Sequence, residues 1–273
     1  MSIPKIIHYC WFGGNPLPEL AKKCIASWKK YCPDYEIIEW NESNYNISTA
    51  PLYVREAYEA KKWAFVTDYV RLKVLYDYGG IYMDTDVEVL KPLDSLLQYE
   101  AVSGFESLSQ IPTGLIGCHK AAPIIGELMQ DYDNLHFKNN DGSYDLTTNV
   151  IRITNALIKY GLVPNNTFQT VKGFTFLPKD YLCPKDLETG DTIITENTLT
   201  VHHFDGSWLS KTDKEIIELT YILKKKGFSY LWAHRFAVMK VFTEEYGVFK
   251  MPFRMVKYKK DNIKRIRSQS TAQ

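Results

Sequence analysis

The chain has 273 residues, of which 45% are apolar and 24% charged; this excludes disordered and fibrous proteins and suffices for a large buried core. Its net charge of +1 hides an uneven distribution, because residues 250–273 carry eight Lys and Arg against Asp261 alone. This local charge of +7 leaves −6 for the first 249 residues, and a basic end on an acidic body indicates contact with something anionic.

The five cysteines are scattered and form no C-x-x-C pair, which argues against a disulfide framework or a zinc knuckle and favours a reducing compartment. The chain does not open with a charged segment followed by an apolar run, and no apolar stretch is long enough to span a bilayer. These features predict an intracellular, cytoplasmic protein.

Strands and helices are expected to alternate from the start of the chain. The run KIIHYCWFGG is typical of a strand that ends at Gly13-Gly14. Two prolines then precede a helical pattern of apolar residues over 21–28, and residues 35–40 resemble a second strand. This order predicts an α/β sheet, whose ligands bind at the carboxyl ends of its strands.

The next segments follow the same logic. A helix is predicted over 63–78, ended by Gly79-Gly80, and is followed by a strand over 81–90. Further strands are expected near 101–105, 113–119, 173–178 and 199–204, with helices near 122–133 and 147–160, and helices again beyond 210. We therefore expect one catalytic domain over 1–210 and a helical, basic C-terminal extension over 211–273.

Asp84 and Asp86 stand two residues apart in the predicted strand 81–90, so both carboxylates would point to the same face. An EF-hand is excluded because Val89 stands where its loop needs glycine, and a glycosidase pair would have to flank the scissile bond. A hard divalent cation that also binds a diphosphate fits better, since Mg²⁺ takes one or two carboxylates together with phosphate oxygens.

Two further pairs bear on the same chemistry. Asp68 and Arg71 share a face of the helix that leads into the aspartate strand, and they suit sugar hydroxyls and phosphate; a surface ion pair is the alternative. His202 and His203 should point to opposite sides, so at most one joins the aspartates as a metal ligand. Either could instead be a core or surface histidine.

Three motifs resemble one family. The segment AFVTDYVRLKVLYDYGGIYMDTDVEVLKPLD (64–94) is similar to the sugar-binding D-x-D region of family 32 glycosyltransferases, IPKIIHYCWFGG to their first strand, and HHFDGSW to their C-terminal element. These are retaining enzymes of the GT-A type, related to the glucosyltransferase domain of large clostridial toxins. The resemblance, spread over residues 3–210, implies a Rossmann-like domain with a mixed central sheet.

The resemblance also implies roles for individual residues. Trp11 would stack on the nucleotide base, Asp68 and Arg71 would hold the donor sugar, and Asp84 and Asp86 would bind the metal. The third metal ligand would be His202, with His203 as the second choice, and Ser207 and Trp208 would contact the diphosphate. Where relatives often read T-G-P, this chain has Thr148-Asn149-Val150, which leaves open the roles of Asp145 and of Asn149, a candidate substrate-binding residue.

The expected function is a Mn²⁺- or Mg²⁺-dependent, retaining transfer of a hexose from a nucleotide-diphosphate sugar, UDP-galactose or UDP-glucose on resemblance. The acceptor would be a saccharide, free or lipid-linked, in capsular, exopolysaccharide or other surface-glycan synthesis. Asp68, Arg71, Asp84 and Asp86 are the candidate catalytic residues. No motif carboxylate is an obvious covalent nucleophile, which favours front-face attack in which a leaving phosphate oxygen takes the acceptor proton.

Other functions stay open. They are transfer to a protein acceptor, as in the toxins, a non-catalytic metal- or sugar-binding module, and a metal-dependent phosphodiesterase or nucleotidyltransferase. Beyond residue 230 the chain mixes aromatic, aliphatic and basic residues, which suits peripheral contact with an anionic membrane on its cytoplasmic face. The alternative is that these aromatic residues pack on the catalytic domain. A nucleic-acid partner is not expected, because the basic residues are confined to one end.

Overall fold

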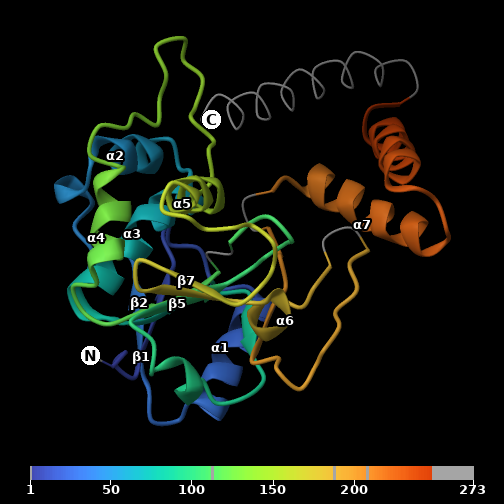
Figure 1. The fold of residues 1–273 in the computed structure, drawn as a ribbon. Helices are drawn as coiled ribbons and strands as arrows, with labels where there is room; N and C mark the ends of the chain where they lie inside the picture. The colour runs from blue at the N-terminus through green and yellow to red at the C-terminus, as the bar shows by residue number, and fades with distance from the viewer. Residues whose placement is uncertain (1, 112–113, 187–188, 207–208, 248–273) are drawn as a thin grey trace. The chain divides into compact units, whose positions relative to one another are not determined.

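The computed structural model describes residues 2–111, 114–186, 189–206 and 209–247. These form two compact units (Figure 1). The sheet unit comprises the described residues of 1–185 and 193–204, and the helical unit comprises those of 186–192 and from 205 onward.

A seven-stranded sheet of order β2-β1-β3-β6-β5-β8-β7 organises the sheet unit. Pairing is parallel for β1–β2, β1–β3 and β5–β8 and antiparallel for the remaining neighbours, so the sheet is mixed. The predicted α/β fold with a mixed central sheet is confirmed. The elements of this unit are β1 (Ile6–Cys10), α1 (Glu19–Tyr31), β2 (Glu36–Trp40), η1 (Ile47–Thr49), α2 (Leu52–Glu59), α3 (Trp63–Tyr78), β3 (Gly80–Met83), β4 (Val87–Val89), η2 (Asp94–Leu96), β5 (Ala101–Gly104), β6 (Leu115–Cys118), α4 (Pro123–Gln130), α5 (Asn149–Ile158), β7 (Gln169–Val171), β8 (Phe174–Leu177), α6 (Lys179–Leu182) and β9 (Thr200–His202).

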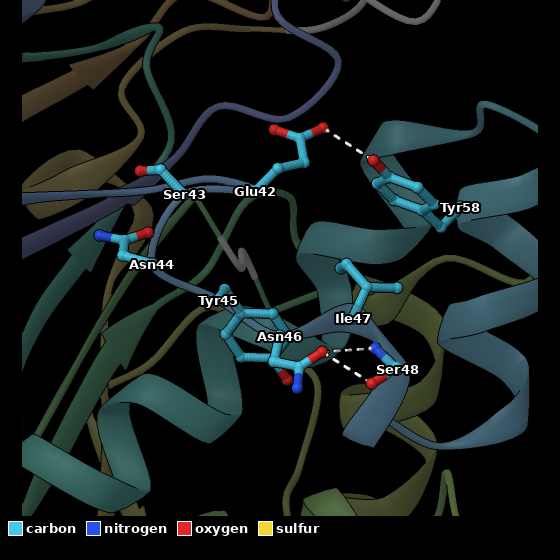
Figure 2. Close-up of a pocket in the computed structure, with 8 residues that line it drawn as sticks. All are labelled: Glu42, Ser43, Asn44, Tyr45, Asn46, Ile47, Ser48 and Tyr58. Atoms are coloured by element: carbon cyan, nitrogen blue, oxygen red, sulfur yellow. Dashed lines mark hydrogen bonds between the residues drawn. The ribbon is translucent and has the colours of Figure 1, made fainter.

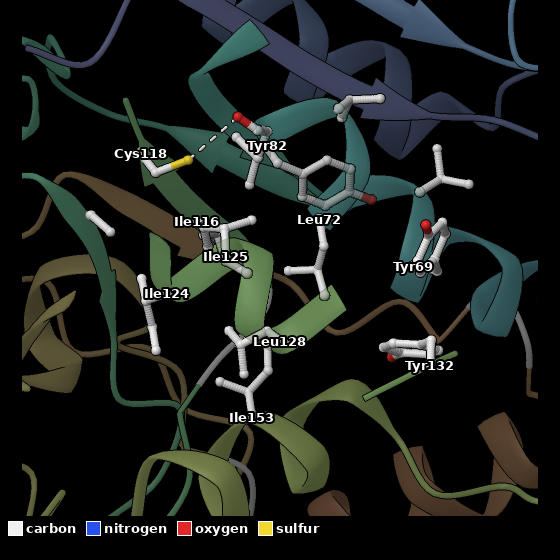
Figure 3. Packing of buried hydrophobic residues seen from close by; sticks show 14 of the residues in the cluster. Tyr69, Leu72, Tyr82, Ile116, Cys118, Ile124, Ile125, Leu128, Tyr132 and Ile153 are labelled. Atoms are coloured by element: carbon white, nitrogen blue, oxygen red, sulfur yellow. Dashed lines mark hydrogen bonds between the residues drawn. The ribbon is translucent and has the colours of Figure 1, made fainter. Parts of the chain in front are cut away.

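Two apolar cores cover the two faces of this sheet. Side chains from α2, α3, α4 and α5 make one core, part of which is shown in Figure 3, and side chains from α1, β4 and the segment around η2 make the other. Helix α3 buries residues on all sides, as expected of a helix enclosed by other elements rather than lying at a surface. Its polar residues Asp68 and Arg71 are therefore buried, which excludes the surface ion pair considered above.

The glycine pair after α3 is required by two separate constraints. Gly79 ends the helix with φ +69°, in the left-handed region that favours glycine. A Cβ on Gly80 would lie 2.6 Å from the Ile6 carbonyl oxygen of the neighbouring strand. Only a residue without a side chain lets β3 begin this close to β1, and β3 leads directly to the aspartates.

The predicted continuous strand over 81–90 is wrong. Strand β3 ends at Met83, and the chain turns through Asp84–Asp86 before β4 begins at Val87 and pairs with β9 in a separate two-stranded sheet. The Asp84 amide donates to the Gly114 carbonyl and the Val87 amide to the Asp84 carbonyl, at 2.8 and 3.0 Å, which closes the turn. The aspartates therefore lie in a connection between strands, not on one strand face.

In the helical unit, α7 (Lys211–Lys225) begins with the Ser210 side chain accepting from the Asp213 amide, and residues 230–247 form a further helix. The helices expected beyond residue 210 are thus present as far as the structure describes the chain. Among the described residues, no helix is long and apolar enough to cross a bilayer. All five cysteines of the chain are buried and unbridged.

Candidate active site

The candidate site lies at one edge of the central sheet. Strands β1, β2 and β3 are parallel, and β2 and β3 flank β1 on opposite sides, so the chain order reverses at β1. The carboxyl ends of such strands, beside a reversal of this kind, form the usual ligand crevice of open α/β sheets. Trp11 follows β1, a polar loop over 41–48 follows β2, and Asp84 follows β3.

Asp84, Asp86 and His202 form a group that could hold a metal ion. Each offers one ligand atom, and these atoms all lie within 4.8 Å of one another. The turn after β3 supplies the carboxylates and the end of β9 supplies the imidazole, with Val87 and His202 directly paired across the two strands. His202 Nε2 lies 3.2 Å from Asp86 Oδ1. Two carboxylates suit both Mg²⁺ and Mn²⁺, and an imidazole favours Mn²⁺ of the two, so the residues fit the expected cation.

The imidazole of His202 is held in a tight space. A Cβ on Gly114 would lie 2.9 Å from His202 Nδ1, and the ring of Phe204 stacks on the imidazole with centroids 4.0 Å apart. Burial alone would lower the pKa of His202, but the Asp86 carboxylate raises it well above its ordinary value. A cation bound between these groups would compete with that proton, as metal sites generally do.

Arg71 joins the metal group to Asp68. One of its terminal nitrogens, Nη2, lies 3.2 Å from Asp68 Oδ1 and 3.4 Å from Asp84 Oδ1. Tyr82 donates a hydrogen bond of 2.8 Å to the same Asp84 oxygen, and the Arg71 guanidinium lies 4.7 Å from the centre of the Tyr82 ring. Burial opposes the Arg71 charge, but Asp84, Tyr82 and Asp68 raise its pKa, so a fixed cation stands beside the aspartates.

Asp68 also contacts the first residue of helix α5. Its Oδ2 accepts from the Asn149 amide at the start of α5 at 3.2 Å, and its backbone carbonyl accepts from Asn149 Nδ2 at 3.0 Å. Burial raises the pKa of Asp68 to about 6, against the stabilising charge of Arg71. The structure thus brings Asn149 against the predicted sugar-binding pair. Asp145 instead forms an ion pair of 2.5 Å with Arg152 and accepts from the Thr147 amide.

The two neighbouring histidines point to different partners. His203 Nε2 lies 2.8 Å from Glu88 Oε2, which also pairs with Lys23 at 3.0 Å. Its backbone amide donates to the Asp86 carbonyl at 2.9 Å, so His203 supports the turn through its main chain. This arrangement favours His202 as the metal ligand.

Trp11 lies half-buried at the end of β1, with its indole nitrogen donating to the Asn15 carbonyl at 2.6 Å. The loop that carries it is fixed by the loop after β2, because the Gly13 amide donates to Glu42 Oε1 at 2.8 Å. Glu42 lines an open depression of about 450 Å³ together with Ser43, Asn44, Tyr45, Asn46, Ile47, Ser48 and Tyr58 (Figure 2). Its amides, hydroxyls and tyrosines are groups that bind polar ligands such as saccharides.

Glu106 is a site residue that sequence reasoning missed. It follows β5, which runs in the same direction as β3, so both strands end at the same edge of the sheet. The pKa of Glu106 is raised, mainly by burial. His202 opposes this shift, and the carboxylates of Asp84 and Asp86 add to it. The sequence shows a carboxylate two residues after β5, a predicted strand, but it does not show in which direction that strand runs in the sheet. The predicted contacts of Ser207 and Trp208 lie outside the described residues.

Part of this site lies in a region that matches a known family. Residues 18–103 match the family described as a glycosyltransferase sugar-binding region containing a DXD motif. Asp68, Arg71, Asp84 and Asp86 lie inside this region, whereas Trp11 and His202 lie outside it. The predicted resemblance to D-x-D glycosyltransferases is confirmed.

Curated relatives include two proteins of Schizosaccharomyces pombe. The chain is 33% identical over 143 residues to inositol phosphoceramide mannosyltransferase 3, which covers 50% of this chain and 39% of that protein. It is 37% identical over 102 residues to inositol phosphoceramide mannosyltransferase 2, covering 36% and 29% respectively. The matches thus span well under half the length of these relatives. Among solved structures, PaToxG glycosyltransferase matches with a TM-score of 0.45 at 20% identity, over 58% of this chain and 70% of that one.

Proposed function

We propose that this chain is a divalent-metal-dependent glycosyltransferase that moves a hexose from a nucleotide-diphosphate sugar to a saccharide acceptor with retention of configuration. The observation that carries the proposal is the convergence of Asp84, Asp86 and His202 next to the buried Arg71–Asp68 pair. This group combines cation ligands with a fixed positive charge and a hydroxyl acceptor. A nucleotide-diphosphate sugar presents the complementary groups, a diphosphate beside a ring of hydroxyls.

Asp84, Asp86 and His202 would hold Mn²⁺ or Mg²⁺, which when bound supplies Lewis-acid stabilisation of the charge on the departing diphosphate. Arg71 adds a positive charge in a buried setting, where it interacts more strongly than in water. Asp68 would accept hydrogen bonds from sugar hydroxyls, with Asn149 beside it. The depression after β2 and the Trp11 loop lie at the ends of neighbouring strands and are available for the nucleotide or the acceptor.

Retention is proposed to follow front-face attack. The acceptor oxygen bonds to the anomeric carbon on the face from which the diphosphate leaves, the carbon–oxygen bond to the phosphate breaks, and the acceptor proton passes to a phosphate oxygen. Glu106 is a half-buried carboxyl at this edge that a double displacement could use. Burial and the Asp84 and Asp86 carboxylates raise the pKa of Glu106, against the opposing effect of His202, and so work against the ionised form that a covalent nucleophile requires.

The proposed donor and acceptor come from the family resemblance and from the names of relatives. UDP-galactose and UDP-glucose come from the family resemblance, and the names of the two yeast relatives add a mannose donor and a lipid-linked acceptor. A glycolipid acceptor on the cytoplasmic leaflet, used in surface-glycan synthesis, would agree with the five buried free cysteines expected in a reducing compartment.

The test is a panel of UDP- and GDP-linked hexoses incubated with the purified protein and Mn²⁺, with nucleoside diphosphate release and anomeric configuration of the product as readouts. We expect one donor to be turned over, with loss of turnover in EDTA and recovery on adding Mn²⁺. Release of nucleoside monophosphate would indicate a phosphodiesterase instead. Binding of donor without any turnover would indicate a binding module.

A further inference from the structure

The helical unit has a second apolar surface that its own core does not use. Helix α7 and the helix over 230–247 pack through Ile216, Ala237, Val238, Val241 and Phe242, with Leu219 and Tyr246 at the edge. One side of the later helix, which includes the large residue Phe242, therefore faces α7. This packing leaves other large apolar residues of the helical unit outside the cluster.

Those residues are exposed; four of them lie on the helix over 230–247, and Phe228 lies two residues before it. The apolar stripe consists of Phe228, Leu231, Trp232, Phe236 and Met239, whose exposed fractions are 53%, 56%, 65%, 49% and 45%. Trp232, Phe236 and Met239 are spaced i, i+4, i+7, which places them on one face, on the opposite side from Ala237 and Val241. Contiguous exposed apolar surface of this kind marks an interaction site on an otherwise soluble fold.

The charged residues around the apolar stripe are all basic. Residues 224–240 contain Lys224, Lys225, Lys226, Arg235 and Lys240 and no Asp or Glu. Arg235 lies with its guanidinium 5.9 Å from the centre of the Trp232 ring, and at helical spacing it and Lys240 fall on opposite sides of the stripe. The sequence beyond residue 249 adds a further +7.

We propose that the apolar stripe lies in the interface of an anionic lipid bilayer, with the helix over 230–247 parallel to the membrane and its basic residues at the headgroups. Tryptophan and phenylalanine flanked by Lys and Arg are the composition of interfacial helices. The surrounding positive charge complements anionic lipid and disfavours pairing of the stripe with a second copy of itself. The proposal does not depend on transferase activity, since it concerns binding alone.

The test is co-flotation of the full chain with vesicles of phosphatidylcholine and phosphatidylglycerol, compared with phosphatidylcholine alone, at low and high salt. We expect binding to the anionic vesicles that weakens with salt. The double variant Trp232→Ser with Phe236→Ser should lower the bound-to-free ratio by about tenfold or more, because each side chain loses its apolar burial in the interface. The matched control, Val163→Ser with Phe168→Ser, changes exposed apolar residues of the sheet unit and should bind as wild type does.

A second variant tests the proposal independently if the first one misfolds. Lys224→Gln with Lys226→Gln leaves the apolar stripe intact and should weaken binding to anionic vesicles, with a smaller salt dependence than wild type. Circular dichroism would verify that each variant is folded. Failure of the wild-type chain to float with anionic vesicles, or equal flotation of the folded stripe variant, would overturn the proposal. So would a dimer in sedimentation that the stripe substitutions dissociate while flotation is unchanged.

Discussion

At the scale of single residues, the site is a chain of buried and half-buried polar groups in which each charge has a partner of opposite sign or a hydrogen-bond donor. Asp68 contacts Arg71 and the start of α5, Arg71 contacts Asp84, and Asp86 contacts His202. Burying charges in this way opposes folding unless the geometry is well satisfied, so such groups are candidates for function rather than stability. The sequence alone predicted these residues, because the i, i+3 spacing of Asp68 and Arg71 and the D-x-D motif of Asp84 and Asp86 are local patterns.

Asp68 allows the effect of burying a carboxylate on the free energy of unfolding to be measured. Its pKa of about 6 in the folded protein exceeds the ordinary 3.8, so the folded state binds more protons than the unfolded state between these values. Stability is therefore lost as the pH rises from 3.8 to 6, by on the order of 3 kcal/mol. Asp68→Asn removes the ionised group, so above pH 6 we expect a melting temperature equal to or above that of wild type, together with loss of donor turnover.

Thermal unfolding of both proteins at a series of pH values checks this prediction. The stability of wild type relative to the variant should fall as the pH rises through 6. A variant that is less stable than wild type above pH 6, by a margin independent of pH, would mean that the ion pair of Asp68 with Arg71 stabilises the fold.

His202 and His203 give a second prediction at this scale. Only His202 lies with Asp84 and Asp86, whereas His203 contacts Glu88 at a partly exposed position. His202→Ala should weaken Mn²⁺ binding in the presence of UDP by at least about tenfold, and His203→Ala by less than about threefold, since exposed ion pairs contribute little. Titration calorimetry with Mn²⁺ measures both, and the opposite ranking would exchange the roles of the two histidines.

At the scale of elements, the sequence predicted helices better than the connections that carry the chemistry. The helix over 63–78 is confirmed to the residue by α3, because its apolar periodicity and terminal glycines are local signals. The strand over 81–90 was wrong, since its break depends on pairing of β4 with β9, more than a hundred residues away. Glu106 was missed for the same reason: β5 obtains its direction from β6.

One added methyl group tests the close approach between the residue before β6 and the last residue of β9. Gly114 has an ordinary backbone conformation, yet a Cβ there would lie 2.9 Å from His202 Nδ1. Gly114→Ala should displace the imidazole and weaken Mn²⁺ binding by about tenfold, in the range seen when the orientation of a ligand is disturbed. Gly126→Ala is the matched control, because its Cβ would lie 3.0 Å from the Tyr76 ring, away from the site. Equal Mn²⁺ affinity in the two folded variants would show that the position of His202 does not matter for the metal.

At the scale of the whole molecule, the site is assembled from segments that only the fold brings together. The family region over 18–103 contains the aspartates and Arg71, whereas the histidine comes from β9 and Asn149 from α5. Resemblance to one family assigned the aspartates, Arg71 and His202 to the site and left the role of Asn149 open. Their mutual distances, and the exposed apolar stripe of the helical unit, required the structure.

The measurement that tests the central claim most directly is the turnover of Asp86→Asn at saturating Mn²⁺, beside Glu88→Gln. Both substitutions neutralise a carboxylate in the same short segment, but Glu88 contacts Lys23 and His203 and stands outside the metal group. With the cognate donor, we predict that Asp86→Asn unfolds at a temperature near that of wild type and loses at least about a hundredfold in kcat, as removal of one transition-state charge partner does. Glu88→Gln should stay within about threefold of wild type, since its partners are partly exposed. Near-normal turnover by folded Asp86→Asn would contradict metal-dependent sugar transfer at this site.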